Sequence, residues 1–262
     1  MTDDNIETLY LGRSVLQWTG DKTMDHASGI WGRPKMLEYL QKYVINKGDA
    51  AVDFGCGAGF PTLQLAEMVG EDGRVIGLDS SEAMIIQALH YQREPHLTFH
   101  LADITKPLSI EPGIADVATA FMVCHNLRLP DLRAMLQNVE FVLKPGGTAV
   151  LLTMHGDALD SDWQLSFMKY DQDAIELYRR REDKEGVLVR GVVQNTSGGK
   201  KEVAMYTHTR FNFFDAIKDA GLTAVDGREI WSDQEIAEQK FGANSVILLP
   251  SNPIFWIVVL RK

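Results

Sequence analysis

Residues 51–60 read AVDFGCGAGF, and this stretch decides the fold. Its first four residues are mostly apolar, as expected of a strand that helices cover on both faces. Gly55 and Gly57 permit backbone conformations and close approaches that a Cβ would block. Pro61 suits the first turn of a helix, where its missing N–H costs nothing. The stretch therefore predicts a buried strand, a glycine-rich turn with free N–H groups facing a ligand, and a helix over residues 61–68.

A second apolar stretch, Arg74–Asp79, predicts a strand that ends in an acid. It lies about 20 residues beyond the glycines, the spacing at which a carboxylate accepts hydrogen bonds from the hydroxyls of a bound ribose. Glycine triplets alone also occur in ordinary tight turns between a strand and a helix. The turn and the acid together indicate a cofactor that contains adenosine, without yet saying which one.

Three further features separate the candidate cofactors. Phe60 stands where a dinucleotide fingerprint expects its third glycine. Leu97–Asp103 predicts a third strand that ends in another acid, and Leu143–Gly147 predicts a turn before the apolar strand Thr148–Met154. In this combination the sequence resembles the class I S-adenosylmethionine-dependent methyltransferases, of the type that acts on small molecules. The resemblance covers roughly residues 45–155 and returns weakly from Tyr206 onward.

Strands and helices alternate as far as residue 154, which predicts an α/β fold with a doubly wound parallel sheet. In the family the last strands form an antiparallel pair, here Thr223–Trp231 and Pro253–Leu260, so we expect a seven-stranded, mostly parallel, Rossmann-like sheet. Trp163–Arg180 predicts a helix. The segment NTSGG joins two strand-like runs, residues 186–193 and 201–208, and predicts a β-hairpin. We interpret this helix and hairpin as an inserted substrate lid.

The chain accordingly divides into four predicted parts. Residues 1–47 form an N-terminal helical arm or lid, and residues 48–154 the S-adenosylmethionine-binding core. Residues 155–208 form the inserted lid, and residues 209–262 complete the core sheet.

The resemblance implies the cofactor contacts. Asp53 orients the glycine turn and the amino-acid end of the cofactor, or alternatively caps N–H groups of the turn. Asp79 binds the ribose. Asp103 accepts from the adenine amino group, or alternatively is only a turn residue. Met84 packs on the adenine or ribose, or else lies in the core, and the aromatic face of Tyr10 attracts the sulfonium. The full predicted set is Asp53, Gly55, Cys56, Gly57, Gly59, Asp79, Ser80, Met84, Asp103, Ile104, Phe121 and Tyr10.

Methyl transfer from a sulfonium is an in-line displacement for which the protein mainly supplies alignment and a closed site. An acidic acceptor such as a phenol needs a base within reach, whereas an amine needs none. His125 follows the predicted strand Ala115–Phe121 and is the candidate base, because imidazole titrates near neutral pH. A structural histidine bonded to a backbone carbonyl is the alternative. The predicted substrate-lining residues are Trp31, His155, Tyr170 and Tyr206.

The composition of the 262 residues restricts the partners. A formal net charge of −10 without a long basic run disfavours nucleic acids and anionic membranes. The two cysteines, Cys56 and Cys124, have no spacing that resembles a zinc motif, so we expect no metal. The acidic N-terminus lacks an apolar run, so we expect no signal peptide, no membrane span and a cytoplasmic location. We expect a small-molecule substrate and a monomer or homodimer.

The favoured function is thus S-adenosylmethionine-dependent O- or N-methylation of a small molecule. A non-methylating protein that binds S-adenosylmethionine on the same scaffold is one alternative, because fold does not fix function. An RNA or protein methyltransferase is another. An NAD-dependent oxidoreductase shares the glycine turn and the ribose acid, but Phe60 and the Leu143–Gly147 turn argue against it.

Overall fold

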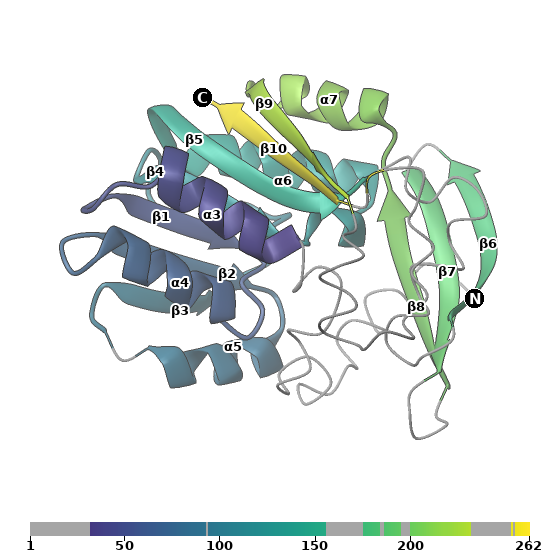
Figure 1. The fold of residues 1–262 in the computed structure, drawn as a ribbon, viewed down its shortest axis with the longest axis horizontal. Coiled ribbons are helices and arrows are strands. Elements are labelled where there is room, and N and C mark those ends of the chain that lie inside the picture. The colour runs from purple at the N-terminus through teal and green to yellow at the C-terminus, as the bar shows by residue number, and fades with distance from the viewer. Residues whose placement is uncertain are drawn as a thin grey trace.

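The computed structural model describes residues 32–92, 94–155, 175–183, 186–194, 200–231, 253 and 255–262. Within these residues the chain forms one large sheet with helices on both faces and a second, smaller sheet beside it (Figure 1). The predicted α/β class with a doubly wound, mostly parallel, seven-stranded sheet is confirmed.

The large sheet has the strand order β3-β2-β1-β4-β5-β10-β9. The pairs from β3 to β5 are parallel, and β10 runs antiparallel to both β5 and β9, as the family resemblance predicts. The strands are β1 (Ala50–Phe54), β2 (Arg74–Asp79), β3 (Leu97–Leu101), β4 (Ala115–Phe121), β5 (Leu143–Met154), β9 (Thr223–Ile230) and β10 (Phe255–Arg261). The predicted turn at Leu143–Gly147 appears as an irregular start of β5, because the pairing with β4 jumps from Leu143 to Thr148.

Two apolar cores lie on opposite faces of this sheet. Helices α3, α4 and α5 cover one face, where Leu40 and Leu65 are buried with Ala51. Helices α6 and α7 cover the other, where Leu136 packs with Val52. Successive residues of β1 thus face different cores, which explains why that strand is apolar throughout. The helices are α3 (Arg33–Tyr43), α4 (Phe60–Val69), α5 (Glu82–Ala88), α6 (Leu129–Val142) and α7 (Arg210–Asp219).

The order of the strands creates the ligand edge. β1 pairs with β2 on one side and with β4 on the other, both in parallel. The chain therefore reverses its winding direction between β1 and β4. Open α/β sheets bind ligands in the crevice outside the carboxyl ends of the strands at such a point.

A second, three-stranded antiparallel sheet contains β6 (Ile175–Asp183), β7 (Gly186–Gln194) and β8 (Lys200–Thr207). The β7–β8 pair confirms the predicted hairpin. The helix predicted over Trp163–Arg180 is wrong from Ile175 onward, because β6 pairs with β7 along its length. Ile175 and Leu177 alternate with polar neighbours, a period of two that the wider helical pattern obscured. Residues 163–174 lie outside the described part of the chain.

Candidate functional site

The glycine turn after β1 is built from three residues in the left-handed region. Gly55, Gly57 and Gly59 have φ values of 70°, 55° and 89°. A Cβ on Gly55 would lie 2.5 Å from Cγ2 of Val123, and one on Gly59 would lie 2.9 Å from Cζ of Phe99. A Cβ on Gly57 would meet nothing within 4 Å. The turn is therefore packed tightly at its two ends and open at its centre, where bare backbone is available to a ligand.

Asp79 fastens this turn to the end of β2. Its Oδ2 accepts a hydrogen bond of 2.8 Å from the Gly57 N–H, and its Oδ1 accepts one of 2.9 Å from the Ser81 N–H. Burial raises the pKa of the carboxyl, and these two N–H donors oppose that rise. Each carboxylate oxygen has a second acceptor position, so Asp79 keeps capacity for two hydroxyl donors. Ser81 also caps α5, while the predicted contact Ser80 is exposed.

Asp53 lies beneath the turn and is 1% exposed. It accepts hydrogen bonds from the hydroxyls of Thr62 at 2.7 Å and Thr119 at 2.8 Å. Among the described residues its donors are thus side chains of α4 and β4, and not the turn N–H groups that one interpretation expected. Burial raises the pKa of Asp53 to about 6, although both hydroxyls and the Arg33 charge act in the opposite direction. Asp53 therefore joins β1, α4 and β4 under the glycine turn.

The raised pKa of Asp53 predicts a pH-dependent stability. The folded state binds the proton of the Asp53 carboxyl more tightly than the unfolded state does. The loss of folding free energy caused by the buried charge is therefore absent below pH 3.8 and complete above about pH 6. The D53N protein keeps the shape of the side chain without the buried charge, and the threonine hydroxyl that faces Nδ2 must turn to accept a hydrogen bond instead of donating one. We expect it to be more stable than the wild type by about 2 to 3 kcal/mol at pH 7.5. Thermal unfolding of both proteins at pH 4 and pH 7.5 checks this. An equal difference in stability between D53N and the wild type at the two pH values would contradict it.

The predicted adenine end lies beyond β3. Asp103 is exposed, and its Oδ1 accepts from the backbone N–H of Thr105 at 2.9 Å and from its hydroxyl at 2.7 Å. The carbonyl of Ile104 accepts from Nδ2 of Asn138 at 2.8 Å, and the Ile104 side chain is buried. Met84 is half-buried at the start of α5. The carboxyl ends of β2 and β3 are neighbours, so Asp79 and Asp103 lie along the same edge of the sheet.

The end of β4 carries a strained backbone. Met122 has a φ of 60°, the left-handed region that residues other than glycine rarely adopt. Its N–H donates to the carbonyl of Leu152 at 2.8 Å. Phe121 before it is buried, and Val123 after it fills the space beside Gly55. Strain of this kind is often found at functional sites.

A short 3₁₀ turn, η4 (Cys124–Asn126), follows and carries the candidate base His125, which is half-buried. Burial raises the pKa of the Cys124 thiol to about 12 and also raises that of the Cys56 thiol, so neither cysteine is a ready nucleophile.

The β8 strand of the second sheet contacts η4. His208, just after β8, donates from Nε2 to the carbonyl of Leu127 at 2.9 Å. The second sheet thus rests on the segment that holds His125.

The predicted substrate residues fall in different places. Tyr206 is buried on β8, near η4. His155 is fully buried, and its Nε2 accepts from Nη2 of Arg210 at 2.9 Å, while the ring lies 5.0 Å from that of Trp256. His155 therefore belongs to a polar and aromatic cluster where β5, β10 and α7 meet. Trp31, Tyr170 and the predicted cofactor contact Tyr10 lie outside the described residues.

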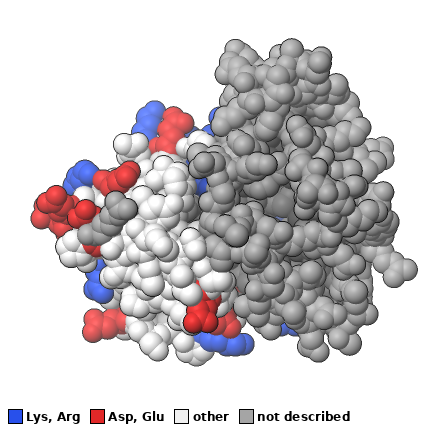
Figure 2. Space-filling view, turned by 90° about the horizontal axis from the view of Figure 1, so that it is seen from below, with Lys and Arg blue, Asp and Glu red and all other residues white. Residues whose placement is uncertain are grey.

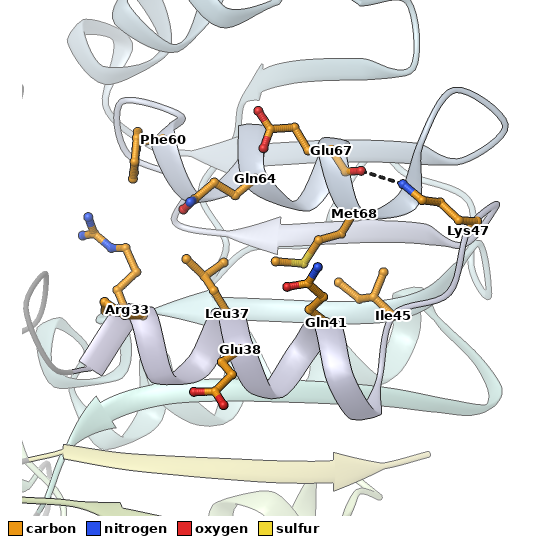
Figure 3. A pocket seen from close by; sticks show the side chains of 11 residues that line it. Arg33, Leu37, Glu38, Gln41, Ile45, Lys47, Phe60, Gln64, Glu67 and Met68 are labelled. Atoms are coloured by element: carbon orange, nitrogen blue, oxygen red, sulfur yellow. Dashed lines mark hydrogen bonds between the residues drawn. The ribbon is translucent and has the colours of Figure 1, made fainter.

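A cavity of about 620 Å³ lies between α3 and α4 (Figure 3). Two of its lining atoms, Nε of Arg33 and Oε1 of Gln64, are buried and have no hydrogen-bond partner in the described part of the chain. Sequence reasoning missed both residues. Neither belongs to a spaced motif, and the Gly-Arg-Pro triplet that starts α3 signals only the beginning of a helix.

The described charges do not form a basic surface on the face seen in Figure 2. On the described part of this face, acidic and basic side chains both lie around the edge, and the area between them carries no charged side chain. Among the described helices, none has the length and apolarity needed to cross a membrane.

Comparisons with known proteins point to one family. A family model described as "Methyltransferase domain" matches residues 45–206. A demethylmenaquinone methyltransferase of Lactococcus lactis is 38% identical over 109 residues, which are 40% of this chain and 42% of that protein. A 2-phytyl-1,4-naphtoquinone methyltransferase of Synechococcus elongatus is 34% identical over 110 residues, which are 41% of this chain and 47% of that protein. The chain therefore spans less than half the length of these curated relatives.

Solved structures share the fold. An S-adenosylmethionine-dependent methyltransferase of Mesorhizobium loti aligns with a TM-score of 0.59 at 19% identity, over 87% of this chain and 96% of that one. At this identity the likeness shows the fold alone.

Proposed function

Because the chain belongs to the class I S-adenosylmethionine-dependent methyltransferase family, we propose that it transfers the methyl group of S-adenosylmethionine to a small-molecule acceptor. One observation carries the proposal. The centre of the glycine turn is open at Gly57, and the Gly57 N–H is fixed to Asp79, the acid that would hold the ribose. A nucleoside that binds Asp79 then lies against bare backbone, with no side chain between them.

The described residues fit this cofactor. Asp79 has acceptor capacity for the two ribose hydroxyls, and Asp103 stands on the same edge of the sheet for the adenine amino group. When bound, the cofactor supplies a methyl group activated by its sulfonium. The residues of the chain bind and orient it, and the chain excludes water from the site. Transfer to the acceptor releases S-adenosylhomocysteine, and an acidic acceptor first loses its proton to a base.

We further propose that the acceptor is a small planar ring compound that presents a hydroxyl or an amine. The names of the two curated relatives, which are methyltransferases of a naphthoquinone and of demethylmenaquinone, support a ring substrate. The matched stretches are less than half of each of these proteins. Their names therefore support the class of compound, a ring, and not a particular substrate. The proposed base is His125, because η4 follows the carboxyl end of β4, next to the edge where the acceptor would approach.

Calorimetry tests the proposed function. We expect S-adenosylmethionine and S-adenosylhomocysteine to bind at micromolar concentrations, about −8 kcal/mol, and NAD not to bind. Incubation with a panel of hydroxylated and amino-substituted ring compounds should then release S-adenosylhomocysteine. Binding of NAD, or of none of the three ligands, would refute the proposal.

A further inference from the structure

The 3₁₀ turn η4 depends on the rest of the protein for its position. It has three residues, and turns of this kind are short because their hydrogen bonds have poor geometry. The bond that closes it, from the Leu127 N–H to the Cys124 carbonyl, is 3.2 Å long. The strained Met122 precedes it, and such strain persists only where the surroundings enforce the conformation. The orientation of His125 on this turn is therefore set by contacts from outside η4.

The backbone that enters η4 is fixed on the side of the glycine turn. The Met122 N–H donates to the carbonyl of Leu152 at 2.8 Å. Val123 packs against Gly55, since a Cβ on that glycine would lie 2.5 Å from Cγ2 of Val123. These contacts hold the residues that lead into η4.

His208 anchors the backbone that leaves η4. Its Nε2 donates to the Leu127 carbonyl at 2.9 Å, and its side chain is 7% exposed. Burial lowers the pKa of His208, although the carbonyls of Leu127 and Cys124 oppose that shift, so the ring is neutral at neutral pH. A carbonyl can only accept, so the single ring proton lies on Nε2. The anchor is therefore one buried hydrogen bond with a defined donor.

Regular structure on both sides holds His208 in place. β8 ends at Thr207, which pairs with Val187 of β7. α7 begins two residues further on, and the hydroxyl of Thr209 caps it by accepting from the Asn212 N–H at 3.2 Å. A residue positions another precisely when it is itself carried by rigid elements. His208 meets this condition, because a paired strand precedes it and a capped helix follows it.

We propose that His208 is a positioning residue that fixes η4, so that His125 is oriented towards the acceptor during methyl transfer. The inference rests on the proposed function and gives the three-stranded sheet a part in the chemical step. His208 acts through the Leu127 carbonyl and not through contact with the cofactor. Misplacement of a reacting group by about 1 Å can lower a rate about a hundredfold, so a single anchoring bond can control the step.

His208→Leu removes the donor and keeps an apolar side chain. For an acceptor with an acidic hydroxyl, we expect kcat to fall about ten- to a hundredfold and KM for the acceptor to stay unchanged. The dissociation constant of S-adenosylhomocysteine should rise by no more than about threefold, because Val123 keeps its contact with Gly55. His208→Gln carries an amide N–H that can donate to the same carbonyl, so it should restore most of the rate.

A double variant separates positioning from a general loss of structure. If His208 acts through His125, the protein with both His125→Ala and His208→Leu should have the kcat of His125→Ala alone, because residues that act as one unit are not additive. Losses that multiply would overturn the inference. An amine acceptor, which needs no base, should be methylated by His208→Leu at close to the wild-type rate.

Hydrogen exchange tests the anchor without cofactor or acceptor. In His208→Leu the backbone amides of residues 124–127 should exchange about tenfold faster than in the wild type, and in His208→Gln at close to the wild-type rate. The amides of residues 74–79 in β2 are the internal reference. His90→Leu is the matched control, because His90 is exposed, and it should change neither the exchange nor kcat. Equal exchange of residues 124–127 in wild type and His208→Leu would contradict the inference.

Thermal unfolding establishes that each variant is folded. If His208→Leu does not fold, His208→Asn takes its place, because its shorter amide cannot reach the Leu127 carbonyl while it remains polar. The proposed function fails in a different way, since it falls if the wild type does not bind S-adenosylhomocysteine. The inference alone falls if the enzyme is active and either His208→Leu keeps the wild-type kcat or His125→Ala shows that there is no base to position.

Discussion

We expect Asp79→Ala to weaken the binding of S-adenosylhomocysteine by at least about a hundredfold, because two charge-assisted hydrogen bonds of about 1.5–3 kcal/mol each would be lost. Those are the proposed bonds to the ribose. The carboxylate also fixes the N–H groups of Gly57 and Ser81, so the turn loses its attachment to β2 in the variant. The loss should appear in the calorimetric dissociation constant, and activity at saturating cofactor should fall less.

Two companion variants make this result specific. Asp72→Ala removes an exposed acid from the loop before β2 and should leave the affinity unchanged. Asp79→Asn keeps one acceptor oxygen and should give an intermediate affinity. Thermal unfolding of each variant establishes that it is folded, because Asp79 also accepts from the N–H groups of Gly57 and Ser81. An affinity in Asp79→Ala within threefold of the wild type would exclude Asp79 from the cofactor site.

The second large effect is expected at His125. For an acceptor with an acidic hydroxyl, His125→Ala should lower kcat by about 10²–10⁴-fold, the usual contribution of a positioned general base. The dissociation constant of S-adenosylhomocysteine should not change, since the proposed partner of His125 is the acceptor. Initial rates across pH should also lose the limb that reports deprotonation of the base. These rates require the acceptor found in the panel described above.

His90→Ala is the control for this experiment, because His90 is exposed just after α5 and its Nδ1 donates to carbonyls of the last turn of α5. It should retain the wild-type rate and pH profile. A His125→Ala protein with full activity towards a phenolic acceptor would remove His125 from the mechanism. His125 would then have a structural role, as a histidine bonded to a backbone carbonyl.

Much of the core could be predicted because its signals are local. The apolar run before Gly55 needs two covered faces, and Gly55 and Gly59 have φ values and neighbours that forbid a Cβ. The ends of β1 and β2 follow from these constraints. The β7–β8 hairpin was also marked by its turn residues. In each case a few adjacent residues dictate the conformation.

The missed features depend on partners that are distant in sequence. The strand β6 is fixed by pairing with β7, Ile175 opposite Val193, whereas the segment itself carries helix-like apolar spacing. The surroundings of Arg33 and Gln64 exist only when α3 and α4 lie side by side. The strain at Met122 arises where β4 ends against Leu152. No short motif encodes such arrangements, so they become visible only in the folded chain.

The contact between β8 and η4 has a consequence for anyone who wishes to redesign this protein. The three-stranded sheet looks like an exchangeable module, but His208 bonds to the Leu127 carbonyl, and the same segment continues back through Val123 to Gly55. A graft that alters β8 therefore disturbs the floor of the glycine turn as well. A successful chimera would have to take β8 and residues 122–127 from the same parent protein.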